Sequence, residues 1–133
     1  NTYYYSYSTS ATDELFEGGP QIINKTVTPI FYISSGMMLL SEGKTYDGVT
    51  IEGNWAAHDG IVPLASALYP DCDAETAKSY EESIANGETI ESGRWYYMET
   101  LQGTDHFDFC GTKDYPTSAD DFYFSMVEIA NSR

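Results

Sequence analysis

Basic residues are scarce in this chain: 6 Lys and Arg stand against 21 Asp and Glu, which gives a formal charge of −15 at pH 7. Because that balance repels polyphosphates, nucleic acid and anionic membrane surfaces are poor candidate partners. Long apolar runs are also lacking, and none approaches the ~18 residues of a membrane-spanning helix. The composition argues against a nucleic-acid binder and a transmembrane protein, and 133 residues leave room for one domain.

Cysteine is equally scarce, because Cys72 and Cys110 are the two thiols of the whole sequence. Two are too few for a disulfide scaffold, and they lack the paired spacing of zinc ligands. One bridge, two reduced thiols or pairing with another chain all stay open. We expect the single bridge, because Asn24-Lys25-Thr26 is an N-glycosylation acceptor if the chain enters a eukaryotic secretory route. The sequence starts at Asn1 without a signal peptide, so we expect a secreted, processed product or a piece of something longer.

Aromatic residues, by contrast, are plentiful: they make up 15% of the chain and include 12 Tyr, which is too rich for a disordered acidic tail. Tyr3, Tyr5 and Tyr7 recur at every second position and predict a strand over residues 3–8. The run over residues 95–101 is typical of a second, buried strand. A turn follows that run at Gln102-Gly103.

The remaining segments predict helices and loops. Residues 30–40 are apolar and indicate a buried strand or helix, with a Met-rich, lipid-facing surface as the alternative. Residues 71–93 are acidic and indicate a solvated loop with a short helix near residues 74–85. Ser118 is a suitable cap for a last helix, whose apolar face would hold Phe122, Met126, Ile129 and Ala130. The order of elements predicts an α/β fold with too few strands to close a sheet.

Two residues stand out as candidate catalytic groups. His106 lies on a loop just after the second predicted strand, where open α/β sheets hold their working residues. Asp59 opens an Asp-Gly turn on an earlier loop. An Asp followed later by a His gives two thirds of a Ser-His-Asp triad in the chain order of α/β-hydrolases. The serine is missing: there is no Gly-x-Ser-x-Gly motif, and Ser34-Ser35-Gly36 is the nearest imitation.

The surroundings of both candidates are more specific. On the acid loop, Trp55 stands four residues before Asp59, and Gly60-Ile61-Val62 follows. The second signature consists of Gly93-Arg94-Trp95, Gly103-Thr104-Asp105-His106 and Asp108-Phe109. Together these patterns resemble the secreted bacterial lipases of the staphylococcal and thermophilic Bacillus type. Two positions depart from the family pattern, since His58 replaces its usual Asn and Thr104 replaces its Trp.

The resemblance implies what the chain does and what it lacks. Residues 1–133 would form the C-terminal segment of a single α/β-hydrolase domain, with the last sheet strands, the acid and His loops and the final helix. Asp59 would be the triad acid and His106 the general base for hydrolysis of triacylglycerols or related esters. The nucleophilic Ser and the oxyanion hole would belong to an N-terminal companion segment or chain, without which this chain would be inert.

Relatives in that family hold a structural calcium ion beside the His loop. Asp108 fits the first of its ligand positions, whereas Lys113 occupies the second and Asp114 follows one place later. The chemistry itself needs no cofactor, and solvated loop carboxylates are the plain alternative for both Asp residues. The resemblance therefore predicts Asp108 and Asp114 as calcium ligands.

A function of another class also remains open. The Tyr cluster at residues 3–7 and the two Trp residues suit a small, acidic, secreted module that binds carbohydrate or protein through an aromatic surface. Such a module would fold and stay monomeric alone. A hydrolase fragment would aggregate or need its partner.

Overall fold

Parallel strands form the centre of the fold in a computed structural model, which describes residues 2–110 and 119–132. The strand β8 (Trp95–Tyr97) pairs with β1 (Tyr4–Ser6) on one side and with β7 (Lys78–Ser79) on the other, all in parallel. Further along, β2 (Thr9–Ser10) pairs in parallel with β9 (Leu101–Gln102). The strands predicted over residues 3–8 and 95–101 are confirmed in part: residues 4–6 and 95–97 pair in parallel, and the ladder is interrupted before β2 and β9 pair in a second sheet.

The other elements surround this pairing. The short antiparallel strands are β3 (Thr12–Glu14) with β4 (Gln21–Ile23) and β5 (Thr45–Tyr46) with β6 (Val49–Thr50). The α-helices are α1 (Tyr32–Leu39), α2 (Leu64–Leu68), α3 (Tyr80–Ala85) and α4 (Ala119–Asn131). The 3₁₀ turns are η1 (Pro29–Phe31), η2 (Gly53–Trp55), η3 (Asp71–Asp73) and η4 (Asp108–Cys110).

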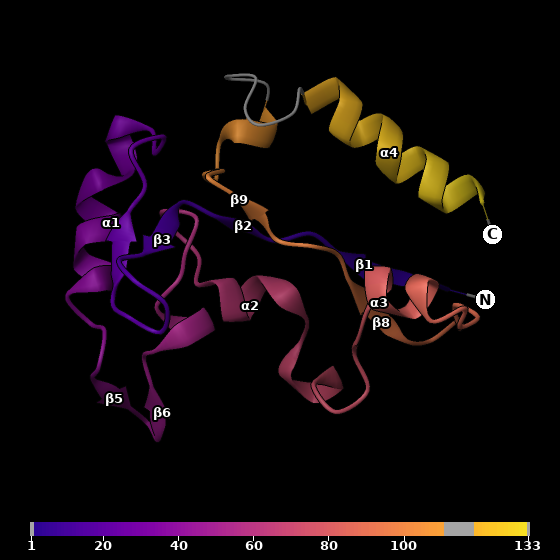
Figure 1. The fold of residues 1–133 in the computed structure, drawn as a ribbon, viewed down its shortest axis with the longest axis horizontal. Coiled ribbons are helices and arrows are strands. Elements are labelled where there is room, and N and C mark those ends of the chain that lie inside the picture. The colour runs from indigo at the N-terminus through magenta and orange to yellow at the C-terminus, as the bar shows by residue number, and fades with distance from the viewer. Residues whose placement is uncertain (1, 111–118, 133) are drawn as a thin grey trace.

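Helices lie on both sides of the central strands. In Figure 1, α4 runs along one side of the β1–β9 region and α2 lies on the other, while α1 stands beside the β3–β4 hairpin at one end. The chain is therefore a mixed α/β structure with parallel strands between helices, as predicted. Among the described residues, no helix has the length and apolar character needed to cross a membrane.

Local sequence explains where α3 begins. Ser79 is its N-cap, and the Ser79 side chain accepts the N–H of Glu82 at 3.2 Å. Glu81 and Glu82 occupy the first turn, where the helix dipole favours negative charge. This helix confirms the short helix expected within residues 74–85, although it starts later because β7 comes first.

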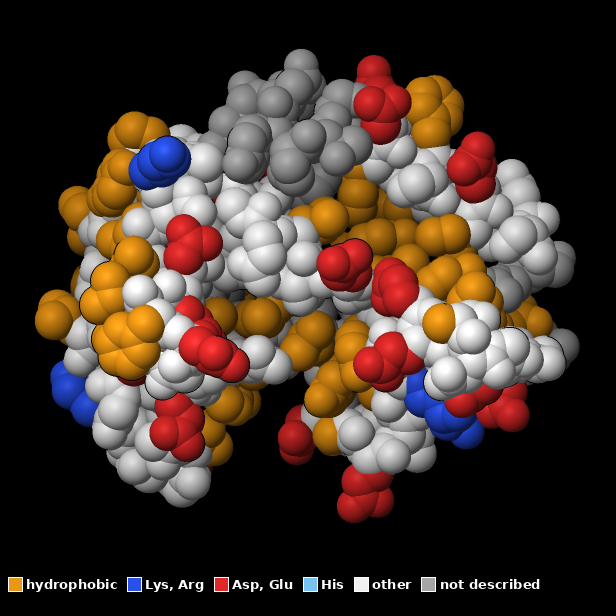
Figure 2. Space-filling model, viewed as in Figure 1, with side chains coloured by type: hydrophobic (Ala, Val, Ile, Leu, Met, Phe, Trp, Pro, Cys, Tyr) orange, Lys and Arg blue, Asp and Glu red, His pale blue; other side chains and the backbone are white. Residues whose placement is uncertain are grey.

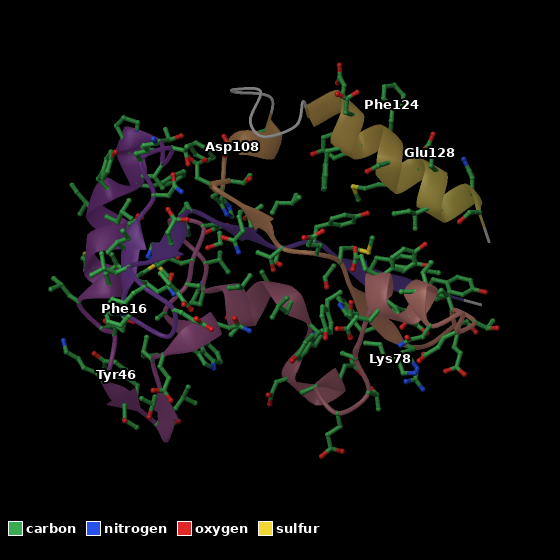
Figure 3. The ribbon with its side chains drawn as sticks, viewed as in Figure 1. Phe16, Tyr46, Lys78, Asp108, Phe124 and Glu128 are labelled. Carbon is green, nitrogen blue, oxygen red and sulfur yellow. The ribbon has the colours of Figure 1, made fainter. Side chains whose placement is uncertain are left out.

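The apolar segment over residues 30–40 is helical, and it is buried on one face only, where Phe31 is 4% exposed and belongs to the core. Ile33 is 79% exposed, Met37 67% and Leu40 74%, and Ser35 is the buried residue of α1. The prediction of a buried element is therefore wrong for this outer face. Phe16, labelled in Figure 3, is another exposed apolar side chain at 64% exposure.

The last helix packs through most of the face that its sequence predicts, while Ala130, which was expected on that face, is exposed. The Phe122 ring meets Tyr7 edge-on with centroids 4.9 Å apart, and Met126 and Ile129 are half-buried. Phe124, on the opposite side, is 68% exposed and points away from the strands (Figure 3). The predicted cap Ser118 lies outside the described residues.

Candidate active site

Two loops meet at the carboxyl ends of β2 and β9. The loop after β9 carries His106. The loop with Asp59 joins the end of β2 because the Ala11 N–H donates to the His58 carbonyl at 2.8 Å. The His106 N–H donates to the Asp59 carbonyl at 3.0 Å, which ties the loops to each other. The fold therefore brings both predicted residues together at the strand edge where open α/β sheets hold their sites.

Its own turn holds the Asp59 carboxylate in one orientation. The residue is 6% exposed, and its Oδ1 accepts the N–H of Ile61 at 3.0 Å and of Val62 at 2.8 Å. Its Oδ2 accepts from His106 Nδ1 at 2.7 Å, and the Thr9 hydroxyl donates to the same oxygen at 3.4 Å. The acid is thus aimed at the imidazole before any substrate arrives.

The contact with Asp59 also fixes the tautomer of His106. An ionised carboxylate can only accept a hydrogen bond, so Nδ1 of His106 carries the proton and Nε2 is the basic nitrogen of the neutral ring. The His106 side chain is 43% exposed, and no described residue bonds to its Nε2. An oriented imidazole with an accessible Nε2 is the arrangement that a general base requires.

A cavity of about 460 Å³ opens beside this pair. His106 and Asp59 form part of its wall, and apolar side chains from the strands, the acid loop, α2 and α4 form most of the rest: Tyr5, Tyr7, Val62, Ala67, Phe122, Tyr123 and Met126. Figure 2 shows apolar side chains gathered in the hollow beneath α4. The pair therefore lies at the edge of an apolar recess.

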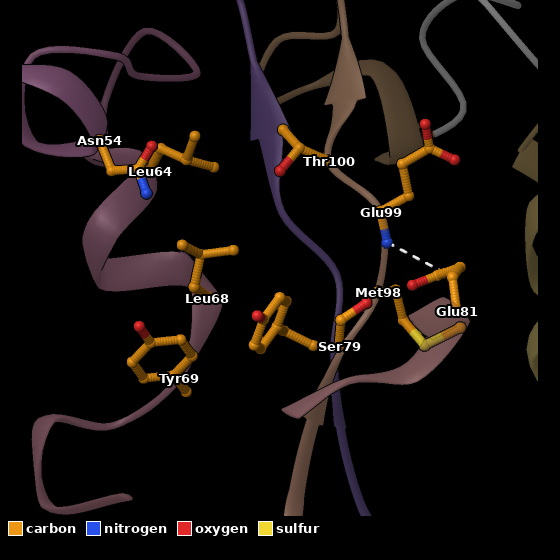
Figure 4. Close-up of a pocket in the computed structure, with 10 residues that line it drawn as sticks. Asn54, Leu64, Leu68, Tyr69, Ser79, Glu81, Met98, Glu99 and Thr100 are labelled. Carbon is orange, nitrogen blue, oxygen red and sulfur yellow. Dashed lines mark hydrogen bonds between the residues drawn. The ribbon is translucent and has the colours of Figure 1, made fainter. Parts of the chain in front are cut away.

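A second cavity, of about 550 Å³, lies between α2 and the strand β8 (Figure 4). Its wall combines Leu64, Leu68 and Tyr69 with the acidic residues Glu81 and Glu99. The Glu99 N–H donates to a Glu81 carboxylate oxygen at 3.0 Å. Neither His106 nor Asp59 lines this cavity, so the catalytic candidates do not face it.

Buried carboxylates brace the loop that carries His106. Asp105 is 1% exposed, and its side chain accepts the N–H of Thr28 at 2.6 Å and of Phe107 at 2.9 Å. Asp108, also 1% exposed, accepts the Asp105 N–H at 2.7 Å. These bonds hold the backbone on both sides of His106 in place.

The predicted calcium ligands are only partly visible. Asp108 is buried and engaged with the backbone of its own loop, and Asp114 lies outside the described residues. Within residues 2–110 and 119–132, no group of three or more His, Cys, Asp or Glu side chains is placed to hold a metal ion. Asp108 alone does not make a calcium site, so the ion stays a prediction.

The predicted bridge between Cys72 and Cys110 is not formed. Both side chains are exposed free thiols. The reason is their position: Cys72 lies in η3 and Cys110 ends η4, and Figure 1 places these turns on opposite sides of the central strands.

The predicted glycosylation residue has a structural use of its own. Asn24 donates through Nδ2 to Asp13 at 2.6 Å, and its Oδ1 accepts the hydroxyl of Thr26 at 2.7 Å. The same hydroxyl lies 2.8 Å from the Gly103 carbonyl, just before the His loop, and its single proton can go to either acceptor. Glycosylation at Asn24 stays a prediction, and the sequon residues contribute to the fold without it.

Two residues near the site were not predicted to support it. The Ser34 hydroxyl, in α1, donates to the Gly60 carbonyl at 2.6 Å, and Nδ1 of the buried His58 accepts the Gly60 N–H at 3.1 Å. Ser34-Ser35-Gly36 lies inside a helix and not at a strand-to-helix elbow. The one available signal was His58 itself, a titratable residue where the lipase pattern has Asn.

The fold matches parts of larger solved structures. Staphylococcus hyicus lipase matches with a TM-score of 0.67 at 24% identity, over 96% of this chain and 30% of the lipase chain. EstA from Clostridium botulinum matches with a TM-score of 0.61 at 26% identity, over 90% of this chain and 27% of EstA. The sequence matches no protein-family model and no curated protein. The chain thus has the fold of a fragment of a lipase-like structure, which confirms the predicted resemblance.

Proposed function

We propose that this chain supplies the acid and the base of a Ser-His-Asp triad that hydrolyses carboxylic esters, as a lipase or carboxylesterase. The observation that carries the proposal is the 2.7 Å bond between His106 Nδ1 and Asp59 Oδ2 at the edge of an apolar cavity. The fold shared with part of a lipase and of EstA supports it. Because the chain spans less than a third of either protein, the serine is assigned to a companion segment.

The geometry suits acyl transfer. Nε2 of His106 would take the proton of the serine hydroxyl as its oxygen attacks the ester carbonyl, and would return that proton to the departing alcohol. Water would then hydrolyse the acyl-enzyme with the same imidazole as base. Asp59 would hold the ring and stabilise the imidazolium that forms in each step.

The sheet has an edge where a companion strand would pair. The carbonyls of Thr2, Ser6, Ser8 and Ser10 accept N–H groups of residues 93–104. Because backbone groups alternate between the two edges of a strand, those of Tyr3 and Tyr7 point to the other edge. In the described part of the chain, β1 has no strand partner there. We place the Ser-bearing segment at this edge, with its serine near Nε2 of His106.

The charge and the cavity indicate the substrate class. A formal charge of −15 disfavours strongly anionic lipid surfaces. The recess beside His106 is lined mainly by aromatic and aliphatic side chains, which suits a neutral ester with an apolar group. We also predict, as part of this proposal, that the protein is secreted and that it binds a structural calcium ion.

The alternative of an aromatic binding module gains little support from the rings, although Tyr4 and Trp55 are each 41% exposed. Tyr4 stacks on Trp95 at 5.5 Å with the planes 6° apart, and Tyr5 packs on Tyr96 at 6.3 Å. Tyr7 meets Phe122 edge-on at 4.9 Å. These rings pack on each other across the strands, so they serve the fold more than an outward contact surface.

The direct test is ester hydrolysis by the native preparation, with any companion segment that co-purifies. A His106→Ala variant should lose hydrolysis of a short-chain aryl ester by about 10⁴-fold or more, because the base is gone. Tyr46→Ala is the matched control, since Tyr46 is 52% exposed on the β5–β6 hairpin away from the site. Equal hydrolysis by His106→Ala and the unaltered protein would contradict the proposal.

A further inference from the structure

The second histidine is enclosed beside the candidate site. His58 is 0% exposed, and its backbone is tied on both sides: its N–H donates to the Thr12 hydroxyl at 3.4 Å, and its carbonyl accepts from Ala11. The imidazole reaches from the acid loop toward α1, where the backbone of Ser35 is its neighbour. Nε2 makes no hydrogen bond of normal geometry in the described part of the chain.

One contact of His58 defines its protonation. The Gly60 N–H donates to His58 Nδ1 at 3.1 Å. A nitrogen that accepts a hydrogen bond has a free lone pair, so Nδ1 is unprotonated and the proton of the neutral ring is on Nε2. This tautomer is the reverse of that in His106, whose Nδ1 donates to Asp59.

The accepted N–H belongs to the peptide that shapes the acid turn. Gly60 has φ +104°, and the Phe31 side chain packs where its Cβ would be. Ser34 holds the Gly60 carbonyl from the other side at 2.6 Å. The next two N–H groups, of Ile61 and Val62, bind Asp59 Oδ1. The direction of the Asp59 carboxylate therefore depends on how the Gly60 peptide is held.

We propose that neutral His58 is a positioning residue, which accepts the Gly60 N–H and thereby keeps Asp59 aimed at His106, and that protonation of His58 releases this turn. The proposal rests on the proposed function for its catalytic consequence. Protonation would place a second donor opposite the Gly60 N–H, so the two groups would repel each other. It would also leave a charged imidazole buried against α1, where the cost of removing the charge from water exceeds its attraction to Asp59.

The electrostatic surroundings agree with a neutral ring. Burial lowers the pKa of His58 below 6.5, while the neighbouring Asp59 carboxylate and the Ser35 backbone act in the opposite direction. The groups that face the ring or its backbone from α1, β3 and the acid loop are Ser35, Thr12 and Pro63, all uncharged. Asp59 is the charged neighbour that acts on the ring.

The sign of the pH effect follows from that lowered pKa. Below pH 6.5 the unfolded chain binds a proton at this residue more readily than the folded chain does. The stability that neutral His58 contributes is therefore complete above pH 6.5. It is lost as the pH falls from 6.5 through the lower pKa of the folded state.

Two substitutions separate positioning from simple burial. In His58→Asn, the amide oxygen can accept the N–H two residues on, as Asn commonly does in turns, and the side chain does not titrate. In His58→Leu, a side chain of roughly similar size fills the buried position, but the acceptor for the Gly60 N–H is lost. We expect His58→Asn to keep the turn at all pH values between 7.5 and 5, and His58→Leu to lose it throughout.

The test uses the native preparation labelled with ¹⁵N-histidine, with any companion segment that co-purifies. Long-range ¹H–¹⁵N correlation spectra at pH 7.5 report which nitrogen of each ring is protonated, and the His58 and His106 variants assign the signals. We expect the proton on Nε2 in His58 and on Nδ1 in His106. His106 should keep its tautomer in His58→Asn and become a mixture in His58→Leu.

The pH dependence supplies the second readout. Between pH 7.5 and 5, the thermal midpoint of the unaltered protein should fall more than that of His58→Asn. If ester hydrolysis is present, its acid limb should be steeper in the unaltered protein, and His58→Leu should lower kcat by up to about 10²-fold, the scale of a small misplacement.

Clear results would overturn the inference. A proton on Nδ1 of His58, an unchanged His106 tautomer in a folded His58→Leu, or equal pH dependence in the unaltered protein and His58→Asn would each do so. If His58→Leu does not fold, the comparison with His58→Asn still decides. Absence of ester hydrolysis with the expected tautomers would instead contradict the proposed function and leave the positioning role intact.

Discussion

The two histidines act on one turn from two different environments. His106 has a 43% exposed side chain on a cavity wall, and its Nδ1 donates to Asp59. His58 is fully buried, and its Nδ1 accepts from Gly60. A general base needs access to its substrate, whereas a positioning residue such as His58 needs to stay neutral, which burial favours. The same side chain thus serves either role, depending on exposure and on which nitrogen carries the proton.

The largest expected effect breaks the His106 side of this comparison. In Asp59→Asn, the amide can donate to Nδ1 and so favours the wrong imidazole tautomer. We expect ester hydrolysis to fall roughly 10⁴-fold, the loss typical when the acid of a triad becomes an amide. The measurement is kcat/KM for a short-chain ester in the native preparation.

Circular dichroism and thermal melting accompany that measurement as controls for folding. An Asp59→Asn protein that is folded and retains more than a tenth of its activity would show that Asp59 does not orient the base. Because a carboxamide has the same shape as a carboxylate, the packing around this buried side chain should change little.

The second effect concerns Gly60, whose N–H binds His58 and whose turn holds the Asp59 carboxylate that contacts His106. In Gly60→Ala, the residue would keep an unfavourable φ of +104°, and its Cβ would lie 2.9 Å from Phe31 Cβ. We expect a loss of roughly 2–4 kcal/mol in the free energy of unfolding from backbone strain and overpacking. Denaturant titration measures it.

Gly36 is the matched control for that substitution. It lies inside α1 and a Cβ there would meet nothing within 4 Å, so Gly36→Ala should stabilise the protein by about 0.5–1 kcal/mol. Similar losses at both glycines would contradict the clamped arrangement of the acid turn.

A smaller effect sharpens the His58 side. Ser34→Ala removes the hydroxyl that donates to the Gly60 carbonyl and should cost about 1 kcal/mol. Ser35→Ala, one residue on, removes a buried hydroxyl that makes no hydrogen bond to any residue that the structure describes, and it should be neutral or slightly stabilising. Thermal melting of both variants compares them, and a larger loss from Ser35→Ala would contradict the assigned contacts.

The smallest effect is expected from the cysteines. Cys72 and Cys110 are exposed and not bonded to each other. Reduction, or the double substitution to Ser, should therefore change the free energy of unfolding by no more than about 0.5 kcal/mol, as thermal melting can measure. A marked drop in the free energy of unfolding on reduction would show that Cys72 and Cys110 are bonded after all.

The sequence predicted the central strands and the last helix because their patterns are local. Alternating Tyr residues and the run from Trp95 define strands by period alone, and Phe122 with Met126 marks one helix face. The burial of residues 30–40 was mispredicted because an apolar run does not reveal what packs against it. The pairing order β1-β8-β7 depends on contacts far apart in sequence, and no local pattern encodes it.

In the candidate site, too, local motifs predicted some residues, and only the fold revealed the others. Asp59 and His106 were found from motif spacing, and the structure brings them to 2.7 Å. The contribution of His58 was missed because a lone residue before an Asp-Gly turn has no distinctive periodicity. The role of His58 becomes visible only in the fold, where α1 (Tyr32–Leu39), which lies well before His58 in the sequence, packs against the ring. The cysteine pairing was mispredicted for a similar reason, because a sequon elsewhere in the chain does not show whether Cys72 and Cys110 lie close together.

The central claim is that Asp59 and His106 complete a triad whose serine belongs to another segment. Fluorophosphonate labelling of the native preparation, resolved chain by chain and mapped by mass spectrometry, tests it most directly. We expect the label on a serine of a co-purifying segment, and its loss in His106→Ala. A label on a serine of these 133 residues, or none from a well-folded protein that is alone, would contradict the claim.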